Sequence, residues 1–272
     1  MTIRVSALYR YPIKSCKGHA LQAAVTDARG IAGDRRMMIV DAYGDFLTQR
    51  DQPRLALIEP VMSDDDSMTL RAPGMSPICF TPSNEGRRVR VRVWNDVCDA
   101  IDQDNAVAEW LQDFLEAPVR LVRMADDFER RVDPRYARRP SDQTGFADGY
   151  PFLLISQASL DDLNARLDSP IPMNRFRPNI VVSGCDAFAE DDWREFRIGD
   201  IVFNAVKPCA RCSVPTIDQD TAIAGREPIK TLATYRTFGQ KVWFGQNLVA
   251  ANTGVLRVGD AVEIIAKQHN RT

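Results

Sequence analysis

The clearest pattern along the chain is a strict alternation of polar and apolar residues. From Arg88 to Val93 arginines and valines take turns, and this period of two is typical of a β-strand with one buried and one solvated face. The Asn95-Asp96 pair that follows predicts a turn. The arginines could contact nucleic acid, but no aromatic residue is interleaved with them, so we interpret them as a solvated strand face.

Short apolar runs separated by turn residues predict further strands. Residues 36–40 and 46–48, joined through a glycine, are expected to form a hairpin. Later in the chain, residues 119–122, 151–156 and 180–182 are rich in β-forming apolar side chains and are predicted to be strands. Strands therefore dominate the expected secondary structure.

Two segments have the spacing of amphipathic helices. Between Asp104 and Glu116 apolar residues recur at helical intervals with carboxylates between them. The second segment, Gln157 to Leu167, follows a predicted buried strand, and Ser156 is placed to cap its amino end. We interpret both helices as packing elements.

The chain length and a helix-ending proline predict two domains. A chain of 272 residues exceeds the usual size of one domain, and Pro118 ends a helix just before a new strand. We expect domains at residues 1–118 and 119–268. Residues 197–203 and 257–263 both read as strand, Gly-Asp turn, strand, and such recurrence suggests a closed or nearly closed barrel. The predicted fold class is a β-rich α+β protein, with an N-terminal β-barrel-like domain followed by a β-barrel with a few helices.

One long segment has little periodicity. It runs from Arg123 to Tyr150 and contains six arginines. A run of this length without regular structure is unusual inside a compact domain and indicates either a functional loop or a mobile segment. The sequence leaves both alternatives open.

Composition and charge exclude several classes of protein. Hydrophobic residues at 44% and charged residues at 26% are ordinary for a globular protein, and a net charge of -2 argues against a chain built for nucleic acid or an anionic membrane. The amino-terminal residues lack the pattern of a signal peptide, and no apolar stretch approaches membrane-spanning length. We expect a cytoplasmic protein without nucleic-acid or membrane partners, in which any anion site is local.

Six cysteines are too few for a secreted disulfide framework of this length. Four of them lie among apolar or turn residues and are expected to be buried small hydrophobic side chains: Cys16, Cys79, Cys98 and Cys185. The other two, Cys209 and Cys212, belong to the segment Lys207–Asp218, which leaves a predicted strand and enters a loop.

Four interpretations compete for this pair of cysteines. Pro215 and its β-branched neighbours oppose the helix that a thioredoxin-like dithiol requires, and a structural zinc site lacks further ligands. A buried structural pair does not explain the flanking cations Lys207 and Arg211. The remaining interpretation is one reactive thiolate, stabilised by the adjacent cations and able to act as a nucleophile or a ligand for a soft metal. Spacing alone does not decide which thiol or which metal.

The segment Cys209-Ala210-Arg211-Cys212, with the motifs after it, closely resembles the MOSC domain. Those motifs are Thr216-Ile217-Asp218, Gly225, Glu227-Pro228, Leu232, Tyr235-Arg236, Phe244-Gly245-Gln246-Asn247 and Val258-Gly259-Asp260. The front half resembles the N-terminal barrel domain of the same family in Tyr11-Pro12-Ile13-Lys14-Ser15-Cys16-Lys17-Gly18, Gly33-Asp34-Arg35 and Gln52-Pro53-Arg54-Leu55. The chain resembles the amidoxime-reducing and hydroxylaminopurine-detoxifying members in particular, over nearly its whole length.

The resemblance implies a molybdenum cofactor, in which a molybdopterin carries the metal between the two domains. The second cysteine of the segment, Cys212, would ligate the molybdenum. Lys14, Ser15 and Arg35 would hold the pterin phosphate, and Arg177 would contact the cofactor from the second domain. Such a group is strongly anionic, so a protein of acidic composition needs cations gathered from separate segments, and arginine offers planar geometry for phosphate oxygens.

Two further cofactor contacts are expected. Asp148 falls where the family lines the pterin, and Arg211 lies next to the metal ligand. The chain departs from the mitochondrial members at Gly149-Tyr150, where those members carry Thr-Ser.

The implied activity is a molybdenum-dependent reduction of N-hydroxylated compounds such as hydroxylamines, amidoximes and hydroxylaminopurines. Asp218 is a candidate proton donor because it is near Cys212 in sequence. The sequence shows no cysteine cluster for an iron-sulfur centre, so we expect electrons from a separate protein of the iron-sulfur, flavin or haem type. The arginines of residues 123–139 could dock an acidic partner of this kind.

The rival interpretation is a non-catalytic protein that binds the molybdenum cofactor or carries sulfur. MOSC domains also occur in cofactor sulfuration, where an attached domain performs the pyridoxal phosphate chemistry. Binding of pyridoxal phosphate is therefore a family-level possibility, although the sequence shows no sign of such a domain.

Overall fold

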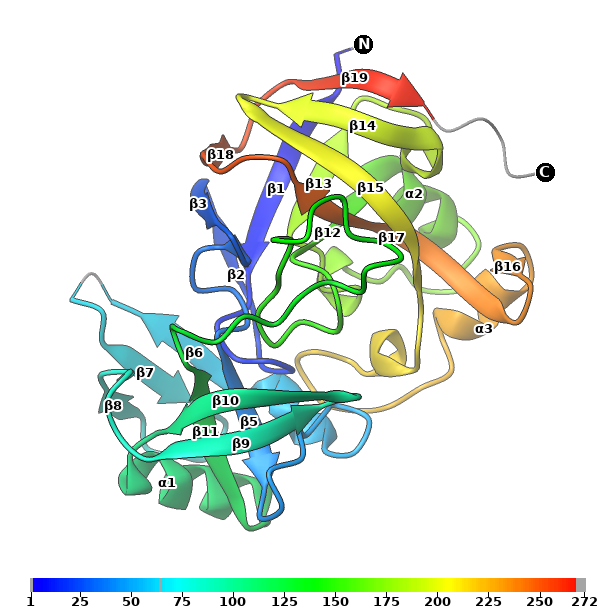
Figure 1. Ribbon diagram of the computed structural model, residues 1–272. Helices are drawn as coiled ribbons and strands as arrows, with labels where there is room; N and C mark the ends of the chain where they lie inside the picture. Colours follow the sequence, from blue (N-terminus) through cyan, green and yellow to red (C-terminus); the bar gives the residue numbers. More distant parts are fainter. Residues whose placement is uncertain (1, 64, 268–272) are drawn as a thin grey trace.

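The computed structural model describes residues 2–63 and 65–267 and is rich in strands (Figure 1). Its strands are β1 (Arg4–Arg10), β2 (His19–Leu21), β3 (Ala23–Asp27), β4 (Gly30–Ile31), β5 (Met37–Asp41), β6 (Glu59–Met62), β7 (Met68–Arg71), β8 (Ile78–Phe80), β9 (Arg88–Val93), β10 (Asp96–Asp102), β11 (Val119–Met124), β12 (Phe152–Ser156), β13 (Ile180–Ser183), β14 (Trp193–Ile198), β15 (Ile201–Ala210), β16 (Thr237–Phe238), β17 (Lys241–Ala250), β18 (Val255–Arg257) and β19 (Val262–Lys267). The helices are α1 (Asn105–Leu115), α2 (Gln157–Asn164) and α3 (Ile229–Ala233), with 3-10 turns η1 (Pro53–Leu57), η2 (Met173–Arg175), η3 (Ala189–Asp192) and η4 (Val214–Thr216).

The largest sheet forms a barrel that the first strand of the chain closes. Its strands follow the order β19, β14, β15, β17, β12, β13, β1, β2. At the other side β1 returns to the start of β19, where the Val5 N–H donates to the Asp260 carbonyl and the Val262 N–H donates to the Ile3 carbonyl, both at 2.9 Å. Side chains from these strands, including the fully buried Leu8, fill the barrel interior.

A small sheet of β18, β3 and β4 adds side chains to the barrel core, and β16 pairs with β17. Strands β5 to β11 form a second unit, drawn at the lower left of Figure 1. One sheet has the order β5, β11, β10, β9 and another has the order β6, β7, β8, and α1 packs into the core that includes side chains from both. The Asp104 carboxylate caps α1 by accepting the Ala106 N–H at 2.8 Å, and Glu116 ends the helix with a φ of 53°. The predicted helix between Asp104 and Glu116 is therefore confirmed.

The β-rich fold class is confirmed, and several details differ from expectation. β11 is hydrogen-bonded to β5 and β10 of the lower unit, whereas β1 belongs to the barrel, so each unit contains a strand from the other side of residue 118. The boundary at residue 118 stays a prediction, and residue 268, its distal limit, lies outside the described residues. The predicted turn after β9 is one residue earlier, at Trp94-Asn95, because Asp96 already pairs with Val93.

The cysteines also correct the sequence analysis. Cys16 and Cys98 are buried as expected, but Cys79 is exposed and Cys185 is half-buried. Cys79 is the middle residue of β8, a three-residue strand at the edge of its sheet. Because neighbouring side chains on a strand point to opposite faces, Ile78 and Phe80 pack inward and Cys79 faces solvent.

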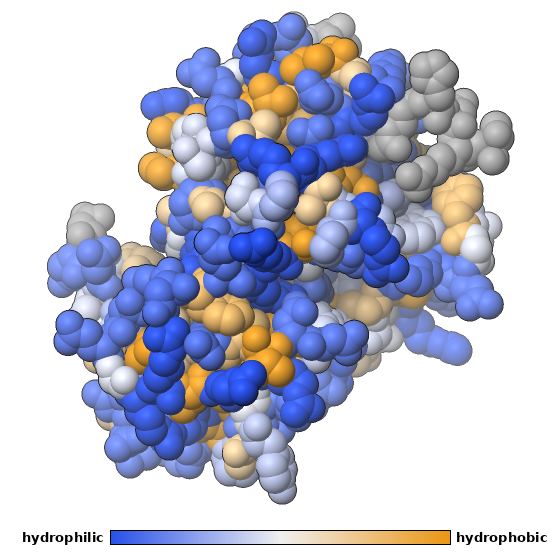
Figure 2. All heavy atoms as spheres, viewed as in Figure 1, coloured by the Kyte–Doolittle hydropathy of each residue, from blue (hydrophilic) through white to orange (hydrophobic). Residues whose placement is uncertain are grey.

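The arginine-rich segment crosses the middle of the face shown in Figure 2, which hydrophilic residues largely cover. Arg130 is buried, and its guanidinium donates to the Gly145 and Ala147 carbonyls and, at 2.8 Å, to Asp96. Arg123, Arg131, Arg135 and Arg139 form ion pairs with nearby carboxylates. Arg130 therefore anchors the loop and is unavailable for docking a partner.

No helix in the described part of the chain combines the length and apolar character needed to cross a membrane.

A buried carboxylate holds the amino end of α2. Glu190 Oε1 accepts the Ser156 N–H at 3.0 Å and the Ser159 hydroxyl at 2.7 Å, while its Oε2 is buried without a partner. Burial raises the pKa of Glu190, and the hydrogen bonds from Ser156 and Ser159 offset this only in part. A carboxyl whose folded-state pKa is raised stabilises the fold below its unfolded pKa, and this contribution is lost as the pH rises through the folded pKa.

We therefore expect Glu190→Gln to be more stable than the wild type at pH 7, by about 1 kcal/mol, because the amide retains an acceptor and removes a buried charge. At pH 4 the two proteins should melt together. Thermal melts at both pH values measure the difference in stability between the variant and the wild type. A difference that is smaller at pH 7 than at pH 4, or that favours the wild type at pH 7, would contradict the prediction.

Candidate functional site

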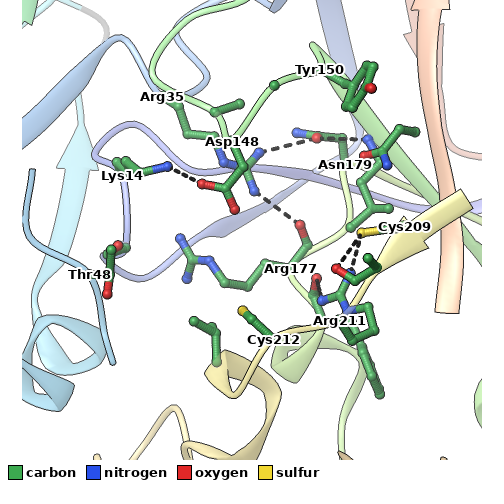
Figure 3. Close-up of a pocket in the computed structure, with 18 of the residues that line it drawn as sticks. Lys14, Arg35, Thr48, Asp148, Tyr150, Arg177, Asn179, Cys209, Arg211 and Cys212 are labelled. Atoms are coloured by element: carbon green, nitrogen blue, oxygen red, sulfur yellow. Dashed lines mark hydrogen bonds and ion pairs between the residues drawn. The ribbon is translucent and has the colours of Figure 1, made fainter. Parts of the chain in front are cut away.

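A pocket lies where the barrel meets the lower unit, and loops from both form its wall (Figure 3). The space between its walls is about 870 Å³, which includes the open solvent at its mouth. Its lining includes Lys14, Ser15, Arg35, Thr48, Gln49, Arg50, Asp148, Tyr150, Arg177, Asn179, Cys209, Arg211 and Cys212. These residues come from six separate stretches of the chain, which lie in loops or, for Cys209, at the end of β15.

The backbone of the pocket is unusual at three positions. Ser15, Arg35 and Arg177 have φ values of 69°, 46° and 57°, in the left-handed region that side chains other than glycine rarely adopt. Such a conformation costs about 1–2 kcal/mol per residue. Strained residues of this kind concentrate at functional sites, and here all three line the same pocket.

Lys14 and Asp148 form an ion pair in the pocket, shown at the left and centre of Figure 3. Lys14 Nζ lies 2.5 Å from Asp148 Oδ1, and the indole N–H of Trp94 donates to the same oxygen at 3.1 Å. Oδ2 is left without a protein donor among the described residues, and the Asp148 side chain is 70% exposed because it faces the open pocket.

Nearby charges and hydrogen bonds keep the Asp148 carboxylate of this ion pair ionised even at acidic pH. The protein around Asp148 partly desolvates its exposed carboxylate and opposes its ionisation, but the charge of Lys14 and the hydrogen bonds from Lys14 and Trp94 outweigh this effect, so the pKa of Asp148 lies well below the usual range. Burial also lowers the pKa of Lys14, and Asp148 offsets that effect in part. Asp148 is therefore an acceptor at neutral pH and can bind a ligand N–H.

Arg35 is held by protein acceptors on several sides. Its Nη1 donates to Asp34 Oδ2 at 2.7 Å and to Asn179 Oδ1 at 3.2 Å, and its Nη2 donates to the Arg177 carbonyl at 3.1 Å. This network fixes the direction of the guanidinium and ties the loop after β4 to the start of β13.

The Arg177 guanidinium has few hydrogen-bond partners among the described residues. The side chain is 9% exposed. Within residues 2–63 and 65–267, its guanidinium has one hydrogen bond, a 3.5 Å contact from Nη1 to Gln219 Oε1, and its buried Nη2 has no acceptor. Burial and the nearby charge of Arg35 lower the pKa of Arg177 to about 10. The residue remains charged at neutral pH without a carboxylate partner within the described chain, which is expected of an arginine that binds an external anion.

The two cysteines of the Cys-x-x-Cys segment have different surroundings. Cys212 is exposed, whereas Cys209 is half-buried and accepts a hydrogen bond from Arg211 Nη1 at 3.0 Å. Arg211 Nη2 donates to the Phe176 carbonyl at 2.8 Å, and Lys207 Nζ lies 4.3 Å from the Tyr136 ring centroid. The cations beside the segment therefore contact Cys209 and Tyr136, and the sulfur of Cys212 is open to the pocket (Figure 3).

Comparison with known proteins agrees with this architecture. The MOSC N-terminal beta barrel domain matches residues 2–118, and the MOSC domain matches residues 141–263. Mitochondrial amidoxime-reducing component 1 of Homo sapiens is 37% identical over 97% of this chain and 83% of its own length, and the Mus musculus protein of that name is 37% identical over 97% and 82%. This chain belongs to the MOSC family. A solved structure, the YUAD protein from Bacillus subtilis, covers 99% of this chain and 98% of its own at 13% identity, but its TM-score of 0.45 is too low to support an argument.

The predicted cofactor residues of this MOSC protein come together. Lys14, Ser15, Arg35, Asp148, Arg177, Arg211 and Cys212 all line the pocket. Their roles stay predictions, but the surroundings suit an anionic, sulfur-bound metal cofactor. Arg177 supplies an unmatched buried cation, and Cys212 supplies an exposed thiol. No group of three or more His, Cys, Asp or Glu side chains suited to a metal ion is present in residues 2–63 and 65–267. Because the described residues offer no such group, the cofactor's own sulfur atoms would complete the ligand set around Cys212.

Asp218 is the predicted site residue that this MOSC protein keeps away from the pocket lining. It accepts hydrogen bonds from Asp220 and Thr221, and its carboxylate lies 3.5 Å from Arg175. Burial opposes its ionisation, but the hydrogen bonds from Asp220 and Thr221 keep the pKa of Asp218 below its usual range. An ionised carboxylate outside the pocket is unsuited to donate a proton there.

Three further residues support the pocket and have no recognisable pattern in the sequence. Gln49 is buried and donates to the Ser15 carbonyl at 2.6 Å and to Gln219 at 3.0 Å, so it connects two segments that approach Arg177. Asn179 accepts from Arg35 and donates to the Tyr9 carbonyl at 3.2 Å. Trp94 holds Asp148 from the β9–β10 turn. None of these residues has a periodic signal, because each acts through a partner distant in sequence.

Proposed function

We propose that this chain is a molybdenum-cofactor-dependent oxidoreductase that reduces N-hydroxylated compounds, such as hydroxylamines, amidoximes and hydroxylaminopurines. The observation that carries the proposal is the pocket itself. An exposed thiol, Cys212, shares one cavity with a buried arginine, Arg177, which has no carboxylate partner in the part of the chain that the structure describes. Identity of 37% to proteins named amidoxime-reducing components supports the choice of substrate class.

When bound, the molybdenum cofactor supplies two-electron chemistry that removes the hydroxyl oxygen of the substrate. Cys212 would ligate the metal as a thiolate, because a soft sulfur ligand suits a metal already bound by sulfur. Arg177 and Arg35 would bind the phosphate, and the planar guanidinium of Arg35 is already oriented by Asp34 and Asn179.

Asp148 would orient the pterin ring. Its Oδ1 is occupied by Lys14 and Trp94, so Oδ2 is the oxygen available to accept a pterin N–H. Because the pKa of Asp148 is low, this acceptor persists through the neutral and mildly acidic range. Lys14 would then act mainly through Asp148 and less through direct contact with the phosphate.

We place this activity in the cytoplasm and expect its electrons to come from a separate electron-transfer protein of the iron-sulfur, flavin or haem type. Arg135 is 79% exposed but forms a close ion pair with Asp133, so a partner that docks on this loop would compete with an internal carboxylate.

The test begins with expression in a host that makes the molybdenum cofactor. We expect about one molybdenum atom per chain and reduction of benzamidoxime or 6-hydroxylaminopurine with reduced methyl viologen as the artificial electron donor. Metal without turnover would favour a cofactor carrier over a reductase. A protein that binds no molybdenum in that host would contradict both functions.

A further inference from the structure

Tyr11 is a buried aromatic residue beneath the pocket to which the proposed function gives no role. It follows β1 directly and is 2% exposed. The guanidinium carbons of Arg35 and Arg177 each lie 4.4 Å from the centroid of its ring. A single aromatic side chain therefore contacts two of the cations that line the pocket.

Hydrogen bonds connect Tyr11 to the segments that carry both arginines. Its backbone N–H donates to Asp34 Oδ1 at 2.8 Å, and Asp34 Oδ2 accepts from Arg35 at 2.7 Å. The Tyr11 hydroxyl donates to the Pro178 carbonyl at 3.1 Å, one residue after Arg177. The ring position, the Arg35 loop and the left-handed backbone at Arg177 are thus fixed relative to one another.

The space that the ring occupies depends on a glycine. A Cβ atom added to Gly18 would clash with the Tyr11 ring carbons, so the absence of a side chain at Gly18 allows the ring to sit where it does. The ring is accordingly held in one place by hydrogen bonds and by close packing.

Two like charges in a partly buried space repel each other. The guanidinium carbons of both arginines lie 4.4 Å from the centroid of the same ring, so the two charges are close together. The face of an aromatic ring is electronegative and attracts a guanidinium. Ring contacts therefore offset the repulsion and keep the two cations in place before any anion arrives.

We propose that Tyr11 is a positioning residue that holds Arg35 and Arg177 as a ready-made pair for the phosphate of the bound cofactor. This inference rests on the proposed function for the identity of the ligand, but its physical content is the binding of a phosphate group by two positioned arginines. Preorganisation of this kind lowers the ordering cost of binding.

The experiment uses cofactor-free full-length protein and inorganic pyrophosphate as the probe, with binding measured by calorimetry. Tyr11→Phe retains the ring and should bind within about threefold of the wild type. Tyr11→Leu removes the ring and should bind at least about tenfold more weakly. Phe114→Leu is the matched control, because Phe114 is also a buried ring with a guanidinium, that of Arg54, 4.5 Å from its centroid, but lies in α1. It should leave pyrophosphate binding unchanged.

A second series separates ring electrostatics from packing and remains informative if Tyr11→Leu fails to fold. Phenylalanine with increasing fluorination at position 11 keeps the ring's shape approximately while reducing the negative charge of its face. Pyrophosphate affinity should fall stepwise along this series. A flat or rising trend would overturn the proposal, and so would wild-type protein that does not bind pyrophosphate. The stepwise loss in a protein that never acquires molybdenum would preserve this inference while rejecting the proposed function.

Discussion

Cys212→Ser is expected to abolish molybdenum retention and lower the rate of benzamidoxime reduction by more than about 100-fold, since even partners outside the direct ligand set of a metal typically cost about 10–100-fold when changed. The sulfur of Cys212 faces the pocket, and within the described residues no other group of protein ligands is gathered for a metal. A serine hydroxyl is a hard, protonated group at neutral pH and is a poor replacement for a thiolate. Molybdenum per chain and turnover with reduced methyl viologen measure the effect.

Two controls accompany this variant. Cys79→Ser removes another exposed thiol, on β8 of the lower unit, and should change neither metal content nor rate. Cys209→Ser removes the thiol that accepts from Arg211, and it should retain the metal because the Phe176 carbonyl still holds Arg211. A Cys212→Ser protein that keeps its full metal content and rate would refute the assignment of the ligand.

Arg177→Met is expected to stabilise the cofactor-free protein and to weaken binding of the cofactor. In cofactor-free protein the guanidinium is buried with a single weak hydrogen bond, so replacing it with an apolar side chain should raise stability by about 1 kcal/mol. In the loaded protein the same change removes a charged partner of the phosphate, which typically costs about 2–5 kcal/mol. Cofactor affinity should therefore fall at least about 30-fold. Thermal melts of both forms and cofactor titration measure the two effects.

Arg175→Met provides the matched control two residues away. Arg175 is equally buried, but it donates to the Pro215 carbonyl at 2.8 Å, pairs with Asp218 and does not line the pocket. Its loss leaves buried acceptors unpaired, so the cofactor-free protein should become less stable. If Arg177→Met destabilises cofactor-free protein as Arg175→Met does, contacts within the protein already satisfy the Arg177 guanidinium, and the residue is not an anion site.

Elements with strong local signals could be predicted from the sequence. The alternation in β9 and the helical spacing of α1 report directly which side of each element is buried, and the structure has the valines and the apolar helix positions inside. The Ser156 cap of α2 was also foreseen, but the helix ends at Asn164 and not at Leu167. α3 spans five residues and is too short for a period to be recognised.

The candidate site was foreseen mainly through motifs that resemble a family, because its residues share no local pattern. The motifs named Cys212, the expected metal ligand, and cations that line the pocket. Asp218 was added as a candidate only because it is near Cys212 in sequence, and the structure places it outside the pocket lining. Gln49, Asn179 and Tyr11 were given no role, because their contacts cross between distant segments.

The sequence by itself determined the β-rich class, the amphipathic elements and a segment of cysteines flanked by cations, because each of these depends on residues within a few positions of one another. Only the tertiary structure decided that β1 closes the barrel and that Arg211 contacts Cys209 and leaves Cys212 open. It also decided that Arg177 is buried with no carboxylate partner among the described residues. These features depend on contacts between distant segments or on which neighbouring atom a side chain reaches. Such contacts are determined by the path of the chain and by packing, so they cannot be predicted from local periodicity.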